Sequence, residues 1–305
     1  MKNQSAASRL RGCSVPAAFT LIELLVVIAV IAVLIAILLP ALGSARDSAI
    51  NIKELSAARQ IMAAHAMYSD DHDQLVLPGF PTVTQIANGD IVCRNDRGQR
   101  IYGLVAQRYP WRLLPYADYE LGLLYLDFER VAELKDLSGG TSYEYVLSLA
   151  PRMGLNIAFV GGSGASDPTG LALLDSAANR QFVKSVFGNG WYVRRTVDAT
   201  RPSRQLVFAS ATGSTIPGNI GIDSLDGNFR VLPPYFQQRL WTETEDPASL
   251  PSASQRGFIA QRAHAKTAVG HLDGHAEALD WREMQDMTRW APQATAPDWT
   301  LPGLN

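Results

Sequence analysis

The chain has 305 residues, of which 47% are hydrophobic and 18% charged, and its 27 basic residues nearly balance its 29 acidic residues. This balance lacks the basic excess that binds nucleic-acid phosphates, so we expect no nucleic-acid partner. Two cysteines, Cys13 and Cys93, allow at most one intrachain disulfide, so we expect the fold to depend on its hydrophobic core.

Residues 1–18 form a short polar segment with the basic residues Lys2, Arg9 and Arg11, and the segment ends in Ala18. A long apolar stretch follows it. In a secretory signal peptide the small-residue cleavage site comes after the apolar core, so the order here is reversed. We therefore predict that residues 1–18 are a leader, which its basic charge keeps in the cytoplasm.

From Phe19 to Leu39 the chain is apolar and carries one charged residue, Glu23. A helix over these residues would span roughly 30 Å, the thickness of the hydrocarbon core of a bilayer. We predict a single membrane crossing, with everything after Pro40 outside the cytoplasm. An ionised carboxylate in a bilayer costs roughly 3 kcal/mol even on lenient scales, so Glu23 is predicted to pair with a functional group.

Two simpler interpretations stay open. A secretory signal peptide could be cut near Ser44 and Ala45, but its apolar core would exceed the usual length of about 7–15 residues. A plain signal anchor is the other alternative. Neither of them explains Glu23 or the reversed order of the leader.

The basic leader, the small residue Ala18, the run from Phe19 to Glu23 and the apolar helix together resemble the N-terminus of type IV pilins and type II secretion pseudopilins. The resemblance implies cleavage between Ala18 and Phe19 by a prepilin peptidase, and N-methylation of Phe19. In these families the residue before the cut is usually Gly. Cleavage would leave Cys93 as the one cysteine, and 24 basic against 29 acidic residues.

The resemblance also implies the partners and the mode of assembly. The partners are copies of this chain, other pilin-like subunits and an assembly platform in the inner membrane. The apolar helices bundle, and Glu23 neutralises the terminal amine of Phe19 in an adjacent subunit.

Helical spacing of apolar residues continues beyond Pro40 to about Tyr68, with Glu54 among the residues assigned to wetter positions. We predict one helix over 19–69, kinked at Pro40 because proline removes a hydrogen bond and clashes with the preceding turn. The acidic segment Asp70–Asp73 follows. It could bind Ca²⁺, although such a cluster is more often a solvated loop.

An α+β head is predicted over 70–290, with an antiparallel sheet on the long helix, and an irregular tail over 291–305. The sequence patterns predict strands over 142–149, 156–160, 205–209, 229–232, 267–272 and 276–279. They predict helices over 171–183 and 281–290, and loops over 161–166 and 211–219.

Three of the five histidines lie in one C-terminal segment and suggest a metal site: His264, His271 and His275. However, the Asp-Gly pair at 273–274 between alternating segments is typical of a two-residue hairpin turn, in which both residues have positive φ. Such a turn would place His271 and His275 on opposite faces of the hairpin. We therefore expect a structural hairpin and no metal.

The same segment resembles the C-terminus of a large group of pilin-like proteins, in which Asp-Gly follows a histidine after roughly nine residues. The matching residues here are His264, Asp273, Gly274 and His275, with eight residues between the first two.

The six tryptophans could form a carbohydrate-binding surface, but tryptophan more often packs in a core or an interface. The prediction is therefore a structural subunit of a type IV pilus or a type II secretion filament, anchored in the inner membrane with a periplasmic or extracellular head. We expect the protein to have no enzymatic activity and to bind no cofactor. The alternative is a membrane-tethered extracellular binding protein or adhesin. An anchored hydrolase is disfavoured because no catalytic set of side chains has suitable spacing.

Overall fold

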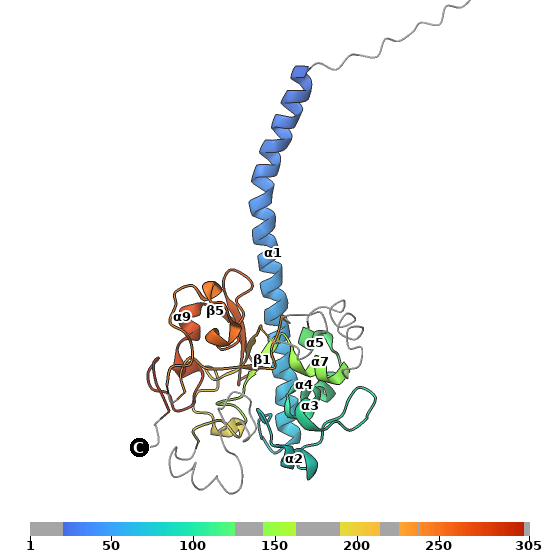
Figure 1. Cartoon of the computed structure of the whole chain (residues 1–305), viewed down its shortest axis with the longest axis vertical. Coiled ribbons are helices and arrows are strands. Elements are labelled where there is room, and N and C mark those ends of the chain that lie inside the picture. The colour runs from blue at the N-terminus through green and yellow to red at the C-terminus, as the bar shows by residue number, and fades with distance from the viewer. Residues whose placement is uncertain (1–20, 126–142, 163–189, 214–225, 237, 302–305) are drawn as a thin grey trace, which may run out of the picture. The chain divides into compact units, whose positions relative to one another are not determined.

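The computed structural model describes residues 21–125, 143–162, 190–213, 226–236 and 238–301 (Figure 1). The chain divides into two compact units, Met1–Arg46 and Asp47–Asn305, which are described separately below. The leader, the cleavage residues Ala18 and Phe19, and the helix predicted over 171–183 lie outside the described residues.

One long helix, α1, covers Leu21–Asp71, and it belongs to both units (Figure 1). The helix continues through Pro40, and the kink predicted there stays a prediction. At its end, Asp73 and Gln74 take positive φ values of 53° and 64°. The N–H of Gln74 donates to the carbonyl of Ser69 at 2.8 Å, which caps a carbonyl of the last turn.

Short helices follow α1 in the head unit. They are α2 (Val83–Ala87), α3 (Gly103–Gln107), α4 (Pro110–Leu113), a 3-10 helix (Leu114–Ala117), α5 (Gly122–Tyr125) and α7 (Tyr143–Leu149). Aromatic side chains connect these helices to their surroundings. The Tyr109 hydroxyl donates to the carbonyl of Met153 at 2.5 Å, and Trp111 Nε1 donates to the carbonyl of Glu144 at 2.9 Å.

A five-stranded sheet forms the other part of the head, with the strand order β3-β1-β2-β4-β5. The strands are β1 (Met153–Asn156), β2 (Leu206–Ser210), β3 (Arg230–Val231), β4 (Thr267–His271) and β5 (Ala276–Leu279). Three of the four pairings are antiparallel, and β1 with β3 is parallel. The predicted α+β class is confirmed, with a mixed sheet.

Four of the predicted strands are confirmed as β2, β3, β4 and β5. The strand predicted over 142–149 is wrong, because these residues form helix α7. Its last four residues, from Val146 to Leu149, are all buried, so the alternation in the sequence does not match the burial.

The strand predicted over 156–160 is also wrong. The strand there is β1, and it ends at Asn156. The Asn156 side chain accepts a hydrogen bond from the N–H of Phe159 at 3.3 Å, and its carbonyl accepts from the N–H of Val160 at 3.0 Å. These local hydrogen bonds turn the chain out of the sheet.

The helix predicted over 281–290 is divided into two short pieces, α9 (Trp281–Met284) and a 3-10 helix (Met287–Arg289). Asp280 caps the first piece in a capping box with Glu283, and Asp286 caps the second. A second N-cap inside the segment explains the interruption, because a capping aspartate favours non-helical backbone.

The hairpin of β4 and β5 differs from the predicted one by one residue. His271 lies opposite His275, and its N–H donates to the carbonyl of His275 at 2.9 Å. The loop contains three residues, 272–274, of which only Gly274 has positive φ, 92°. The Asp273 carboxylate accepts from the N–H of His275 at 3.1 Å, which supports the longer loop. The predicted two-residue turn and the separation of the two histidines are therefore wrong.

Two clusters of buried apolar side chains fill the head unit. Trp299 is partly buried and packs against one of the two clusters. The other five tryptophans are buried within the clusters: Trp111, Trp191, Trp241, Trp281 and Trp290. The packing interpretation of the tryptophans is confirmed. The six tryptophans therefore no longer favour a carbohydrate-binding surface.

Candidate functional site

The first part of α1 presents a long, continuous apolar surface. Its large side chains from Leu21 to Leu42 are exposed, and the exposed fraction of Leu21 reaches 86%. This helix is long and apolar enough to cross a membrane, and none of its most apolar stretch is buried by the rest of the chain. An exposed apolar surface of this size requires a bilayer or other apolar chains around it.

Glu23 lies in the first turn of α1, and Pro40 lies inside the helix. A carboxylate at this place is favoured by the positive end of the helix dipole. In the sequence Glu23 follows Phe19 by four residues, so it would lie close to the N-terminus that cleavage before Phe19 would create.

The second part of α1 belongs to the head unit and buries a stripe of side chains. The stripe consists of Glu54, Ala57, Ala58, Ile61, Met62, Ala64, His65, Tyr68 and Ser69. It meets β4 closely at Gly270, where a Cβ atom would lie 2.6 Å from Cγ of Met62. The missing side chain of Gly270 therefore allows the helix to approach the sheet.

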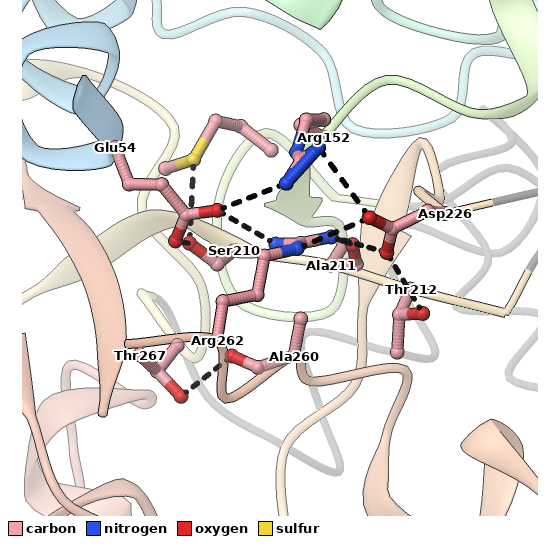
Figure 2. Close-up of polar contacts among 10 residues, drawn as sticks. Glu54, Arg152, Ser210, Ala211, Thr212, Asp226, Ala260, Arg262 and Thr267 are labelled. Atoms are coloured by element: carbon pink, nitrogen blue, oxygen red, sulfur yellow. Dashed lines mark hydrogen bonds and ion pairs between the residues drawn. The ribbon is translucent and has the colours of Figure 1, made fainter. Parts of the chain in front are cut away.

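Glu54 is the charged member of this stripe, and only 3% of its surface is exposed. Its assignment to a wetter position is wrong. The carboxylate accepts from Arg262 Nη1 at 3.0 Å and from the Ser210 hydroxyl at 2.8 Å, and it lies 3.7 Å from Arg152 Nη2 (Figure 2). A buried carboxylate is tolerated only with such partners.

Asp226 is the second carboxylate of this cluster, and Figure 2 shows it on the opposite side of the two arginines from Glu54. It accepts from Arg262 Nη2 at 2.7 Å and lies 3.4 Å from Arg152 Nη1. Burial raises the pKa of Asp226, but the hydrogen bond and charge of Arg262, the charge of Arg152 and the Thr212 hydroxyl outweigh it and lower the pKa overall. The two carboxylates and two arginines thus balance one another. We call this group the helix anchor.

Sequence reasoning missed the helix anchor. Glu54 lies four residues before Ala58 and seven before Ile61, so its spacing places it on the buried stripe of α1. That spacing was the available signal. Its partner Arg262 lies 208 residues away along the chain, and no local pattern could have identified it.

The C-terminal motif residues are only partly brought together. His264 has a positive φ of 50° in a turn, and its Nε2 lies 3.4 Å from the Ser48 hydroxyl. His271 and His275 instead stack, with ring centroids 4.3 Å apart and an angle of 9° between the rings. His275 Nδ1 lies 2.6 Å from Oδ1 of Asp273.

Glu277 completes this group at the hairpin. Its Oε1 lies 3.0 Å from Nε2 of His271 and accepts from Arg289 Nη1 at 2.6 Å. Burial and the neighbouring His275 lower the pKa of His271 to about 4, against the opposing effect of Glu277. His271 is therefore a neutral imidazole near pH 7.

The acidic segment Asp70–Asp73 does not gather its side chains in this way. Among the described residues, the metal-ligand side chains whose ligand atoms converge are those of His271, His275 and Glu277. The aspartates of the acidic segment are not part of that group. The Asp70 carboxylate instead accepts from Gln74 Nε2 at 3.0 Å.

Comparison with protein families matches residues 16–39 to the family described as the prokaryotic N-terminal methylation motif. No curated protein and no solved structure matches the chain. The matched segment contains Ala18, Phe19 and Glu23. It is similar to the N-terminus of type IV pilin-like and pseudopilin-like precursors and points to a structural role, and the apolar helix is long enough to serve as a single-pass membrane anchor.

Proposed function

We propose that this chain is a structural subunit of a type IV pilus or of a type II secretion filament. The observation that carries the proposal is the coincidence of two features in one segment. Residues 16–39 match the methylation motif, and the described part of this segment is an apolar helix whose large side chains are exposed. A helix of this kind can leave the bilayer only if other apolar helices replace the lipid.

The proposed maturation begins with cleavage between Ala18 and Phe19 by a prepilin peptidase, followed by methylation of the Phe19 amine. Before cleavage the chain is a single-pass protein of the inner membrane, with the leader in the cytoplasm and the head in the periplasm. Removal of the basic leader also removes the charge that holds the N-terminus at the cytoplasmic surface.

Glu23 has the central role in the proposed assembly. Cleavage creates a positively charged amine at Phe19, at the end of an apolar helix. In a low-dielectric helix bundle an unpaired charge is costly, and a nearby opposite charge offsets much of that cost. The Glu23 carboxylate of one subunit would therefore neutralise the Phe19 amine of the next and determine the register between helices.

The helix anchor explains how a filament of helices would carry folded heads. Glu54 joins α1 to Arg262 and Ser210 of the head. Because this contact and the apolar stripe lie in one compact unit, a helix drawn into a filament by the assembly platform would bring its head with it.

Intact-mass measurement and N-terminal sequencing of membrane-extracted protein test the maturation step. We expect a chain that begins at methylated Phe19. The matched variants are Ala18→Gly, which restores the residue usual in pilin leaders and should be cleaved at least as completely, and Ala18→Lys, which should remain uncleaved. A wild-type chain that begins near Ala45 would instead show a secretory signal peptide.

A further inference from the structure

Three metal-ligand side chains converge at the β4–β5 hairpin, outside the proposed assembly segment. The ligand atoms of His271, His275 and Glu277 all lie within 4.8 Å of one another. Two imidazole nitrogens and one carboxylate oxygen form a donor set that suits Zn²⁺ and related divalent transition metals.

His271 is the buried member of the group, with no exposed surface. The backbone of Arg204 hydrogen-bonds the ring, whereas Nε2 has no partner in hydrogen-bond geometry although it lies 3.0 Å from the Glu277 carboxylate. Buried polar atoms of this kind are rare because each loses its hydration without a replacement. A metal ion between His271 and Glu277 would supply that replacement.

His275 is held in the form that binds a metal. The Asp273 carboxylate, 2.6 Å from Nδ1, orients the ring and favours the tautomer with a proton on that nitrogen. The lone pair on Nε2 is then available to a metal. A carboxylate behind a ligating histidine is a common arrangement around zinc, and it increases the basicity of the ligand.

Charge balance also permits a cation here. Arg289 contacts Glu277 at 2.6 Å and lies 3.6 Å from Glu283. When a metal takes an oxygen of Glu277, Arg289 keeps Glu283 as a partner. The carboxylates of Asp273, Glu277 and Glu283 together offset a divalent ion and the arginine.

We propose that His271, His275 and Glu277 bind one divalent transition metal ion, with Zn²⁺ as the reference ion and water as the fourth ligand. Zinc requires ligand distances of about 2.0–2.2 Å, so the side chains must close around the ion. The half-exposed side chain of His275, with 43% of its surface accessible, provides this movement. The ion would connect the two strands of the hairpin independently of filament assembly.

Calorimetric titration of the detergent-solubilised, metal-free full-length chain with ZnCl₂ tests the proposal. We expect one site, and at least tenfold weaker binding in His275→Ala and Glu277→Gln. Arg289→Gln should bind Zn²⁺ more tightly, because it removes the cation that competes for Glu277. Titration with Co²⁺ should give the visible absorption of a four-coordinate ion in the wild type and not in His275→Ala.

His264→Ala is the matched control, since His264 lies near the hairpin in sequence but outside the cluster, and its binding should equal that of the wild type. Circular dichroism of each variant verifies its folding. The proposal is overturned if the wild type takes up no Zn²⁺, or if His275→Ala binds as tightly as the wild type. Equal losses in His264→Ala and His275→Ala would also overturn it, because they would place the ion elsewhere.

Discussion

The two parts of α1 share one helix but have opposite patterns of burial. The part in the first unit exposes every large apolar side chain from Leu21 to Leu42, whereas the part in the head unit buries a stripe that includes Glu54 and His65. A contiguous exposed apolar surface of this size is rare on a water-soluble domain. The comparison indicates that the first part requires a bilayer or other apolar chains around it, whereas the second part packs in the head.

Replacement of a single carboxylate in each part separates these two roles. Glu23→Leu should abolish or strongly slow incorporation into filaments, because the Phe19 amine of a neighbouring subunit loses its partner. The variant should remain in the membrane and keep the melting temperature of the wild type. Electron microscopy of labelled filaments, a membrane fractionation and a thermal melt measure these three effects. Normal assembly of Glu23→Leu would contradict the proposed mechanism.

Glu54→Leu should have the opposite profile. Removing one member of a buried ion pair typically costs about 3–5 kcal/mol of folding free energy. Here two arginines would be left with the single carboxylate of Asp226. We expect a large fall in the melting temperature of the detergent-solubilised chain. Lys53→Leu is the matched control, because the adjacent residue is exposed, and it should change stability by less than about 0.5 kcal/mol. A wild-type melting curve for Glu54→Leu would show that the helix anchor does not stabilise the head.

Acid should weaken the head unit through His65. Burial lowers the pKa of His65 to about 4, from 6.5 in the unfolded chain, so the unfolded state binds more protons between these values. The stabilisation is complete above pH 6.5 and is lost as the pH falls toward 4. At pH 5 the stability lost relative to neutral pH is about 2 kcal/mol.

Melting curves between pH 7.5 and pH 5 measure this loss. The variant His65→Leu should show a shallower pH dependence than the wild type, and the variant of the exposed His72, His72→Ala, should not. Parallel pH profiles for His65→Leu and the wild type would contradict this assignment.

The smallest expected effect concerns the hairpin loop. Gly274 has a φ of 92°, and an added Cβ would meet no atom within 4 Å. The cost of Gly274→Val is therefore backbone strain alone, about 1–2 kcal/mol. Asp273→Gly should not relieve any strain at 273, because Asp273 does not have positive φ. A rise in melting temperature for Asp273→Gly would instead support a two-residue turn with positive φ at residue 273.

Several elements follow from local sequence. Four strands of the sheet were predicted within one or two residues from alternation and turn residues, and the apolar helix was predicted from composition and length. These signals are local because a strand or a helix exposes one face at a fixed period. The same signals failed over 142–149, where packing of α7 on the core overrode the β propensity of its residues.

The candidate sites depended more strongly on tertiary structure. A slip of one residue in the β4–β5 register moves every side chain of a strand to the other face, and this slip alone changed the relation of His271 to His275. The sequence contained the Asp-Gly signal but not the hydrogen bond from the N–H of His275 to Asp273 that supports the longer loop.

The sequence by itself determined the motif at residues 16–39, the exposed apolar segment and its one carboxylate, because a bilayer selects length and composition rather than a particular partner. The tertiary structure decided the burial of Glu54, its contacts with Arg262 and Arg152, and the convergence of the hairpin ligands. These contacts join residues far apart in the chain, and their energies depend on distance and desolvation, which only the folded arrangement defines.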